Sequence, residues 1–308
     1  MMPRPARDRL PAGLPARCHD GIVYTEQAVP LRTGVTLFTS VSPGPAQRTL
    51  LVIHGGPDWD HTYLREPLDR LGGGYRVVLP DLRGCGRSTT GLADGQYTPD
   101  AAAGDLLALL DHLGAASAAV LGFSFGGFIG QRLLAAAPGR VTRLIVASSS
   151  VLPVPAGAFT GWPERAERVA AEASVWADPA LTGPALTRAA ATAGARANVW
   201  RPESLPGYLR RLSEVRFTAE WLRPYRAGVM PSPWLEDPLA RLSAAGRPVL
   251  LLHGEKDMTF PAFLAVQAAA GLPQATAVVL PDAGHMAHID DPAAWLAAVR
   301  GFLTADEA

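Results

Sequence analysis

The sequence predicts an α/β fold in which helices flank a mostly parallel β-sheet. Two observations predict it. Short apolar runs alternate along the chain with longer helical stretches, and the runs are apolar at successive positions rather than at every second position. Strands of this kind are typical of a parallel sheet that helices cover on both faces. Hydrophobic residues make up 48% of the 308 residues, which is ample for a large buried core.

The expected elements begin with a hairpin and continue as alternating strands and helices. Residues 23–29 and 35–41 are two β-like runs joined by a short turn. Further strands are expected at 50–54, 75–80, 118–123, 141–147, 248–253 and 277–280. Helices are expected at about 62–71, 99–113, 125–137, 261–271 and 292–303.

The alternation stops between residues 151 and 245. This stretch is helix-rich and holds five of the seven tryptophans, which are Trp162, Trp176, Trp200, Trp221 and Trp234. They could pack a helical subdomain, line the apolar underside of an insert that covers a ligand site, or do both. We expect a flexible extension over residues 1–21, a core formed by 22–150 and 246–308, and a helical cap over 151–245 inserted after the sixth strand.

Charge and composition exclude several classes of partner. Basic and acidic residues both number 28, so the net charge is zero and no global field attracts nucleic acid or an anionic membrane. No apolar run approaches the roughly 18 residues of a membrane span. The two cysteines, Cys18 and Cys85, are too few for a disulfide framework. We therefore expect a cytoplasmic protein whose partner is a small molecule or short peptide. The oligomeric state is left open.

The sequence GFSFG at 122–126 lies directly between an expected strand and an expected helix. In a G-x-S-x-G elbow, the glycines let the chain turn sharply and leave the serine exposed at the carboxyl edge of the sheet. A glycine-rich turn with an incidental serine is the alternative, and the strand–turn–helix context argues against it. Neither G-x-G-x-x-G nor GxxxxGK[ST] is present, so a nucleotide loop is not expected. Ser124 is the predicted nucleophile.

A serine nucleophile needs a base, and on this kind of elbow the base is a histidine that follows the acid in the chain. His285 comes just after the last expected strand, where a loop can bring its ring over Ser124. His253 ends a strand and is expected to pack beneath the site, whereas His288 could replace His285. The pair H-x-x-H lacks the acidic partner and spacing of a zinc helix, so no metal is expected.

The acid that orients the histidine is predicted by position. The loop after strand 248–253 contains Asp257, with Glu255 as a second choice, whereas the loop after strand 141–147 contains no carboxylate. Asp81 and Asp290 are better explained as turn or cap residues. We predict that Asp257 holds the imidazole of the base.

An oxyanion hole requires two backbone N–H groups that point to the carbonyl oxygen of the substrate. One should belong to Phe125, which follows the nucleophile. The loop after the first parallel strand reads HGGP at 54–57, and Pro57 has no N–H, so Gly56 is the expected second donor.

With these residues in place, the chain resembles the α/β-hydrolase superfamily over about residues 22–150 and 246–305. HGGP at 54–57, followed by His61 and Tyr63, and DLRGCGRS at 81–88 resemble the proline iminopeptidase group. The resemblance implies an α/β-hydrolase fold, a triad of Ser124, Asp257 and His285, and no cofactor. It also implies removal of amino-terminal residues, often proline, from peptides, while relatives of the group hydrolyse esters, amides or lactones.

The sequence departs from this group around the substrate. Asp58 stands where the group usually has glycine, and Phe125 stands where it commonly has tryptophan. Met258 follows the predicted acid directly, at a position where peptidases of the group sometimes have a second acid. Glu220 resembles the cap glutamate that holds the substrate's amino group, or is a solvent-facing helix residue. Asp58 could hold an ammonium group or cap the next helix. The further candidates for substrate binding are Trp59, Trp221 and Tyr225.

These residues leave several functions open. The first is a serine aminopeptidase similar to proline iminopeptidases. The second is an esterase, lactonase or thioesterase that acts on a small apolar metabolite. A third, from another class, is a non-catalytic ligand-binding protein on the same scaffold, and a cofactor-free lyase or haloperoxidase-type activity is a fourth.

Overall fold

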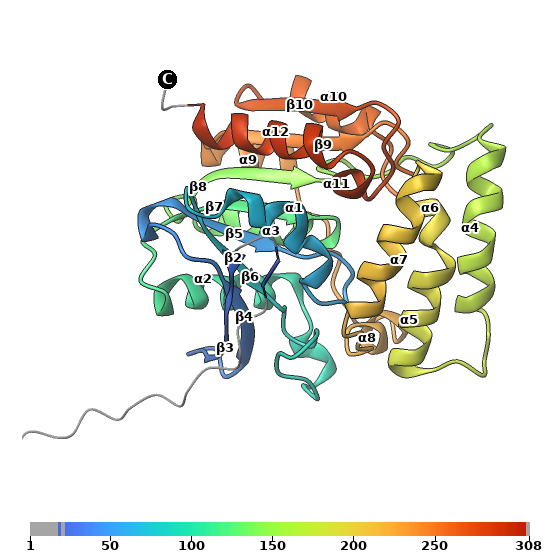
Figure 1. Cartoon of the computed structure of the whole chain (residues 1–308), viewed down its shortest axis with the longest axis horizontal. Coiled ribbons are helices and arrows are strands. Elements are labelled where there is room, and N and C mark those ends of the chain that lie inside the picture. Colours follow the sequence, from blue (N-terminus) through green and yellow to red (C-terminus); the bar gives the residue numbers. More distant parts are fainter. Residues whose placement is uncertain (1–17, 20–21, 306–308) are drawn as a thin grey trace, which may run out of the picture.

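A mostly parallel, eight-stranded sheet lies at the centre of the molecule (Figure 1). The computed structural model describes residues 18–19 and 22–305. The strand order is β10-β9-β8-β7-β5-β6-β4-β3, in which β3 and β4 pair with their neighbours antiparallel and all the others pair parallel. The strands are β3 (Thr25–Pro30), β4 (Thr36–Val41), β5 (Thr49–Ile53), β6 (Arg76–Pro80), β7 (Ala118–Phe123), β8 (Val141–Ala147), β9 (Val249–Gly254) and β10 (Ala275–Leu280).

This architecture confirms the predicted α/β fold with its opening hairpin. Each predicted strand has a counterpart whose ends differ by a few residues. The predicted extension over residues 1–21 lies outside the described residues, except for β1 (Cys18–His19), which pairs with β2 (Ile22–Val23) in a separate small sheet.

The central strands are buried because helices cover both faces of the sheet. Every residue of β5, β7 and β9 is buried. One face packs against α2 (Pro99–His112), α3 (Phe125–Ala136), α9 (Pro238–Ala245) and α10 (Phe263–Ala270). The other face packs against α1 (Arg65–Leu68) and α12 (Pro292–Thr304), and the short α11 (Ala287–Asp290) precedes α12. Apolar residues on both sides of one strand therefore enter two separate clusters, as a parallel sheet requires.

Of the six α-helices between β8 and β9, the first five stand together beside the sheet (Figure 1). They are α4 (Pro163–Trp176), α5 (Gly183–Ala193), α6 (Ala195–Asn198), α7 (Leu205–Glu214) and α8 (Leu222–Arg226), and we call them the cap helices. By contrast, α9 packs against the sheet-covering α3. The division of the chain into core and cap at 151–245 stays a prediction.

Among the helices that the structure describes, none combines the length and the apolar character that crossing a bilayer requires.

Candidate active site

Ser124 stands on a sharp turn between β7 and α3. Its φ angle is 51°, a left-handed value that is uncommon for a residue with a side chain. A Cβ atom on Gly122 would lie 2.3 Å from the carbonyl oxygen of Gly126, and one on Gly126 would lie 2.2 Å from that of Ile53. Only glycine fits at these two positions, so the G-x-S-x-G pattern is a requirement of this turn.

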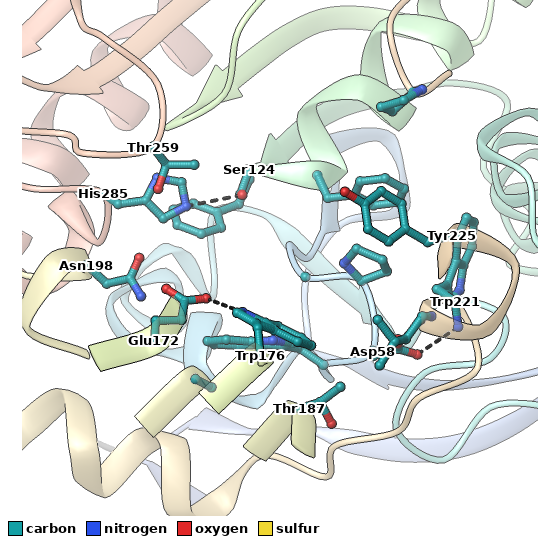
Figure 2. A pocket seen from close by; sticks show the side chains of 18 of the residues that line it. Asp58, Ser124, Glu172, Trp176, Thr187, Asn198, Trp221, Tyr225, Thr259 and His285 are labelled. Carbon is teal, nitrogen blue, oxygen red and sulfur yellow. Dashed lines mark hydrogen bonds between the residues drawn. The ribbon is translucent and has the colours of Figure 1, made fainter. Parts of the chain in front are cut away.

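Three side chains from distant parts of the chain form one hydrogen-bonded line at this turn. Figure 2 shows the part of this line that joins His285 to Ser124. The Nε2 atom of His285 lies 3.1 Å from Oγ of Ser124, and its Nδ1 atom lies 2.9 Å from Oδ2 of Asp257. Oδ1 of Asp257 accepts hydrogen bonds from the backbone N–H groups of Thr259 and Phe260, at 2.7 and 2.9 Å. The structure thus brings together the three residues predicted as a triad.

The charge of Asp257 is stabilised by two imidazole rings. Burial raises the pKa of this carboxyl, but the nearby His285 and the hydrogen bond from His253 outweigh burial and hold the pKa below its usual range. His253 is buried, as predicted, and its Nε2 atom lies 3.3 Å from Oδ2 of Asp257. Asp257 is therefore negatively charged at neutral pH, beside Nδ1 of His285.

His288, the alternative base, lies elsewhere. Its ring is completely buried and packs against Phe123 and Trp295, with ring centroids 5.1 and 5.7 Å away. Burial lowers the pKa of His288 well below its usual value. A neutral, enclosed imidazole of this kind is a packing residue.

The two predicted oxyanion donors face the same cavity as Ser124. Gly56 and Phe125 both line it, and no acceptor for either backbone N–H is found among the described residues. Gly56 has a φ of 111°, which favours glycine. The loop is fixed by its neighbours, because His54 Nε2 accepts a hydrogen bond from Leu82 N–H and the N–H of Gly55 donates to the Tyr63 hydroxyl.

The cavity has a volume of about 640 Å³ and is lined mainly by aromatic and aliphatic side chains. Four of the five residues predicted to bind substrate line it, namely Asp58, Trp59, Trp221 and Tyr225. A drug-sized molecule fits a pocket of this volume. No cluster of three or more His, Cys, Asp or Glu residues suited to a metal occurs in the described part of the chain.

Asp58 lines the cavity, but its carboxylate is already occupied. Oδ1 accepts from the backbone N–H of Trp221 at 3.0 Å, and Oδ2 accepts from that of Leu222 at 2.9 Å. The hydroxyl of Thr218 lies 3.0 Å from Oδ1. Burial raises the pKa of Asp58 against the effect of these donors. The side chain therefore accepts hydrogen bonds at the start of α8, which is one of the cap helices. It does not cap the helical stretch that follows Asp58 in the chain.

Glu220, the fifth candidate, is not among the residues that line the cavity. Its carboxylate accepts hydrogen bonds from the Tyr97 hydroxyl and from the backbone N–H of Gly91. It is 21% exposed and also lies 3.7 Å from Arg223. The structure therefore places Glu220 just before α8, in contact with the segment that contains Gly91 and Tyr97, outside the cavity.

Two charged cap residues that the sequence analysis did not select also line the cavity. These are Glu172 on α4 and Arg226 at the end of α8. Glu172 accepts a hydrogen bond from the indole N–H of Trp176 at 3.0 Å (Figure 2). No motif surrounds either residue, and only the arrangement of the cap helices brings them to the cavity.

Comparison with known proteins agrees with this geometry. The model of the family described as "alpha/beta hydrolase fold" matches residues 48–292. The chain belongs to this family. It is an α/β-hydrolase enzyme, and its predicted place near the proline iminopeptidase group is confirmed by the relatives that follow.

Two curated relatives cover almost the whole chain. The magnesium-chelatase 30 kDa subunit of Rhodobacter capsulatus is 30% identical over 86% of this chain and 90% of its own length. The proline iminopeptidase of Levilactobacillus brevis is 27% identical over 92% and 97%. Among solved structures, a proline iminopeptidase-related protein from Thermus thermophilus is 26% identical, covers 92% of this chain and 98% of its own, and has a TM-score of 0.69.

Proposed function

We propose that this enzyme is a serine hydrolase that works through an acyl-enzyme on Ser124. The hydrogen-bonded line from Asp257 through His285 to Ser124 carries the proposal. His285 takes the proton of Ser124 as the hydroxyl attacks the substrate carbonyl, and gives it to the leaving group. Water then attacks the acyl-enzyme with His285 again as base. Asp257 keeps the proton of the imidazole on Nδ1, so that Nε2 is free to act.

The backbone N–H groups of Gly56 and Phe125 are the proposed oxyanion donors. Neither N–H has an acceptor in the part of the chain that the structure describes, and both residues line the cavity beside Ser124, which supports this role. Such a donor contributes about 2.7–4 kcal/mol to transition-state stabilisation.

The position of the histidine indicates where each half of the substrate lies. His285 must reach the leaving group to protonate it, so the leaving group lies on the His285 side of Ser124. Trp221 and Tyr225 lie on the opposite side of Ser124 (Figure 2). The acyl group would therefore meet aromatic rings. This apolar wall favours an ester, lactone or thioester of an apolar acid as the substrate.

An aminopeptidase is the second candidate. The similarity to proline iminopeptidases supports it, and Glu172 supplies the cavity with a carboxylate for an ammonium group. The acids selected from the sequence support it less, because Asp58 is bonded to the cap backbone and Glu220 lies outside the cavity. Glu172 is thus the remaining carboxylate candidate, but Figure 2 places it on the His285 side of Ser124. The amino group of an aminopeptidase substrate belongs to the acyl half, which is proposed to lie on the other side, so the position of Glu172 also favours the first candidate.

One parallel assay tests these proposals. Purified protein is given acyl nitrophenyl esters and prolyl and other aminoacyl anilides, with Ser124→Ala as the blank. Ester hydrolysis that depends on Ser124 would support the first candidate. Anilide cleavage that is lost on N-acetylation and in Glu172→Gln would establish the second. If Ser124→Ala keeps the activity of the wild type, the nucleophile is wrong, and if neither substrate class reacts, a non-catalytic role gains weight.

A further inference from the structure

The carboxylate of Asp58 joins two segments. One is the loop after β5, residues 54–58, which carries the proposed donor Gly56 and which we call the oxyanion loop. The other is the segment 218–222, which leads into α8. Asp58 follows Gly56 by two residues, whereas its partners lie about 160 residues further along the chain. Its own carbonyl oxygen also accepts the N–H of Thr218 at 2.9 Å. Both oxygens of the carboxylate and the backbone of Asp58 thus contact one cap segment.

The loop that contains the DLRGCGRS motif holds the same segment. The indole N–H of Trp221 donates to the carbonyl oxygen of Arg83 at 2.7 Å. The hydroxyl of Thr218 donates to the carbonyl oxygen of Gly84, also at 2.7 Å. Two core loops therefore fix the backbone and the side chain of Trp221 together.

Fixing Trp221 has a consequence at the nucleophile. Its ring is completely buried and meets the ring of Phe125 edge-on, with centroids 5.4 Å apart. Phe125 directly follows Ser124, and Phe125 and Trp221 are both among the residues that line the cavity. Trp221 therefore forms the wall of the cavity on the side away from His285 (Figure 2), where the acyl group is proposed to lie.

We propose that Asp58 is a specificity-determining positioning residue, which sets the size and shape of the acyl pocket by holding Trp221 against Phe125. This inference rests on the proposed serine-hydrolase function. A carboxylate suits the position because it only accepts hydrogen bonds, and the two backbone N–H groups it meets only donate. An asparagine there would turn a donor toward one of them.

The test compares the variants Asp58→Gly and Glu220→Gln with the wild type. Glycine removes the carboxylate and tolerates the φ of 71° that Asp58 adopts. Glu220→Gln is the matched control, because Glu220 anchors the same segment to Tyr97 and Gly91 without lining the cavity. Each protein is assayed on nitrophenyl esters from acetyl to octanoyl, and hydrogen exchange is measured over residues 218–222.

We expect Asp58→Gly to lower the ratio of kcat/KM for the octanoyl ester to that for the acetyl ester at least tenfold, mainly through KM. The acetyl group is too short to use the Trp221 wall. The N–H groups of Trp221 and Leu222 should exchange faster. Asp58→Asn, which keeps one accepting oxygen, should fall between glycine and the wild type. Glu220→Gln should keep the wild-type ratio.

An equal loss on all esters in Asp58→Gly would overturn the inference, because it would place the effect on the oxyanion loop or on stability. An unchanged rate of exchange over residues 218–222 would also overturn it. A different result would show that the proposed serine-hydrolase function is wrong, namely ester turnover that survives in Ser124→Ala. Hydrogen exchange over residues 218–222 shows whether Asp58 holds the segment, whether or not the serine-hydrolase function is correct.

Discussion

Two imidazole rings, those of His285 and His253, contact the same carboxylate oxygen of Asp257. The other oxygen accepts hydrogen bonds from two backbone N–H groups, so both oxygens of the carboxylate have partners. A buried charge is tolerated only when it is paired and hydrogen-bonded in this way. In the proposed mechanism, this fixed position keeps the proton of His285 on Nδ1 and leaves Nε2 to accept the proton of Ser124.

Removing members of this line should not give additive losses. We expect Ser124→Ala, His285→Ala and the double variant each to lose roughly 10⁴- to 10⁶-fold in kcat, because the residues act as one unit. Steady-state turnover on the best ester, with circular dichroism as the folding control, checks this. Single losses that multiply in the double variant would show that the two residues act independently.

The lowered pKa of Asp257 also predicts how stability depends on pH. The pKa of Asp257 is lower in the folded chain than in the unfolded chain, where an Asp has a pKa of about 3.9. The ionised carboxylate therefore stabilises the fold at pH values above about 4, and this contribution is lost as the pH falls further. Urea unfolding of the wild type and Asp257→Asn at several pH values measures it. The difference in unfolding free energy should be constant above about pH 5 and shrink below about pH 4. A difference that stays constant down to pH 3 would refute the lowered pKa.

At the scale of elements, the turn between β7 and α3 depends on glycines that permit backbone contact. A Cβ atom on Gly126 would lie 2.2 and 2.6 Å from the carbonyl oxygens of Ile53 and His54, and these backbone atoms at the end of β5 cannot move aside at low cost. The turn is thus locked to the neighbouring strand, whose end leads into the loop with Gly56, the proposed oxyanion donor. This packing fixes the distance between Ser124 and Gly56.

Gly126→Ala should therefore destabilise the protein by about 3 kcal/mol, as overpacking does in other tightly packed sites. Gly104→Ala is the matched control, since Gly104 lies within α2 with nothing within 4 Å of its Cβ position. Alanine in a helix is about 0.5–1 kcal/mol more favourable than glycine, so this variant should be slightly more stable. Denaturant unfolding separates the two, and equal effects would count against the close contact.

Local signals explain why the core elements were predictable. The strand 118–123, the elbow and α3 follow one another within 20 residues, and each carries its own pattern of apolar residues or glycines. The helix 238–245 shows the limit of this reasoning. It lies in the segment predicted as cap, yet it packs on α3, because an apolar helix face does not indicate which partner it will meet.

At the scale of the whole molecule, the site combines parts that the sequence could and could not place. The meeting of Ser124, Asp257 and His285 was predictable because the chain order of the fold restricts each to one loop. The contacts of Asp58 and Glu220 were not predictable, because their partners lie 123 to 164 residues away and depend on how the segment 218–222 packs against the loops that follow β5 and β6. Glu172 has no motif at all, and only the position of α4 brings it to the cavity.

The central claim is that Ser124 forms an acyl-enzyme. The most direct test is to form a stable covalent adduct on the same serine oxygen. The protein is treated with a fluorophosphonate, and intact and peptide mass spectrometry locate the modification. We predict one adduct, on Ser124, that is absent in Ser124→Ala and forms far more slowly in His285→Ala. Modification of another residue, or an adduct that persists in Ser124→Ala, would contradict the proposed mechanism.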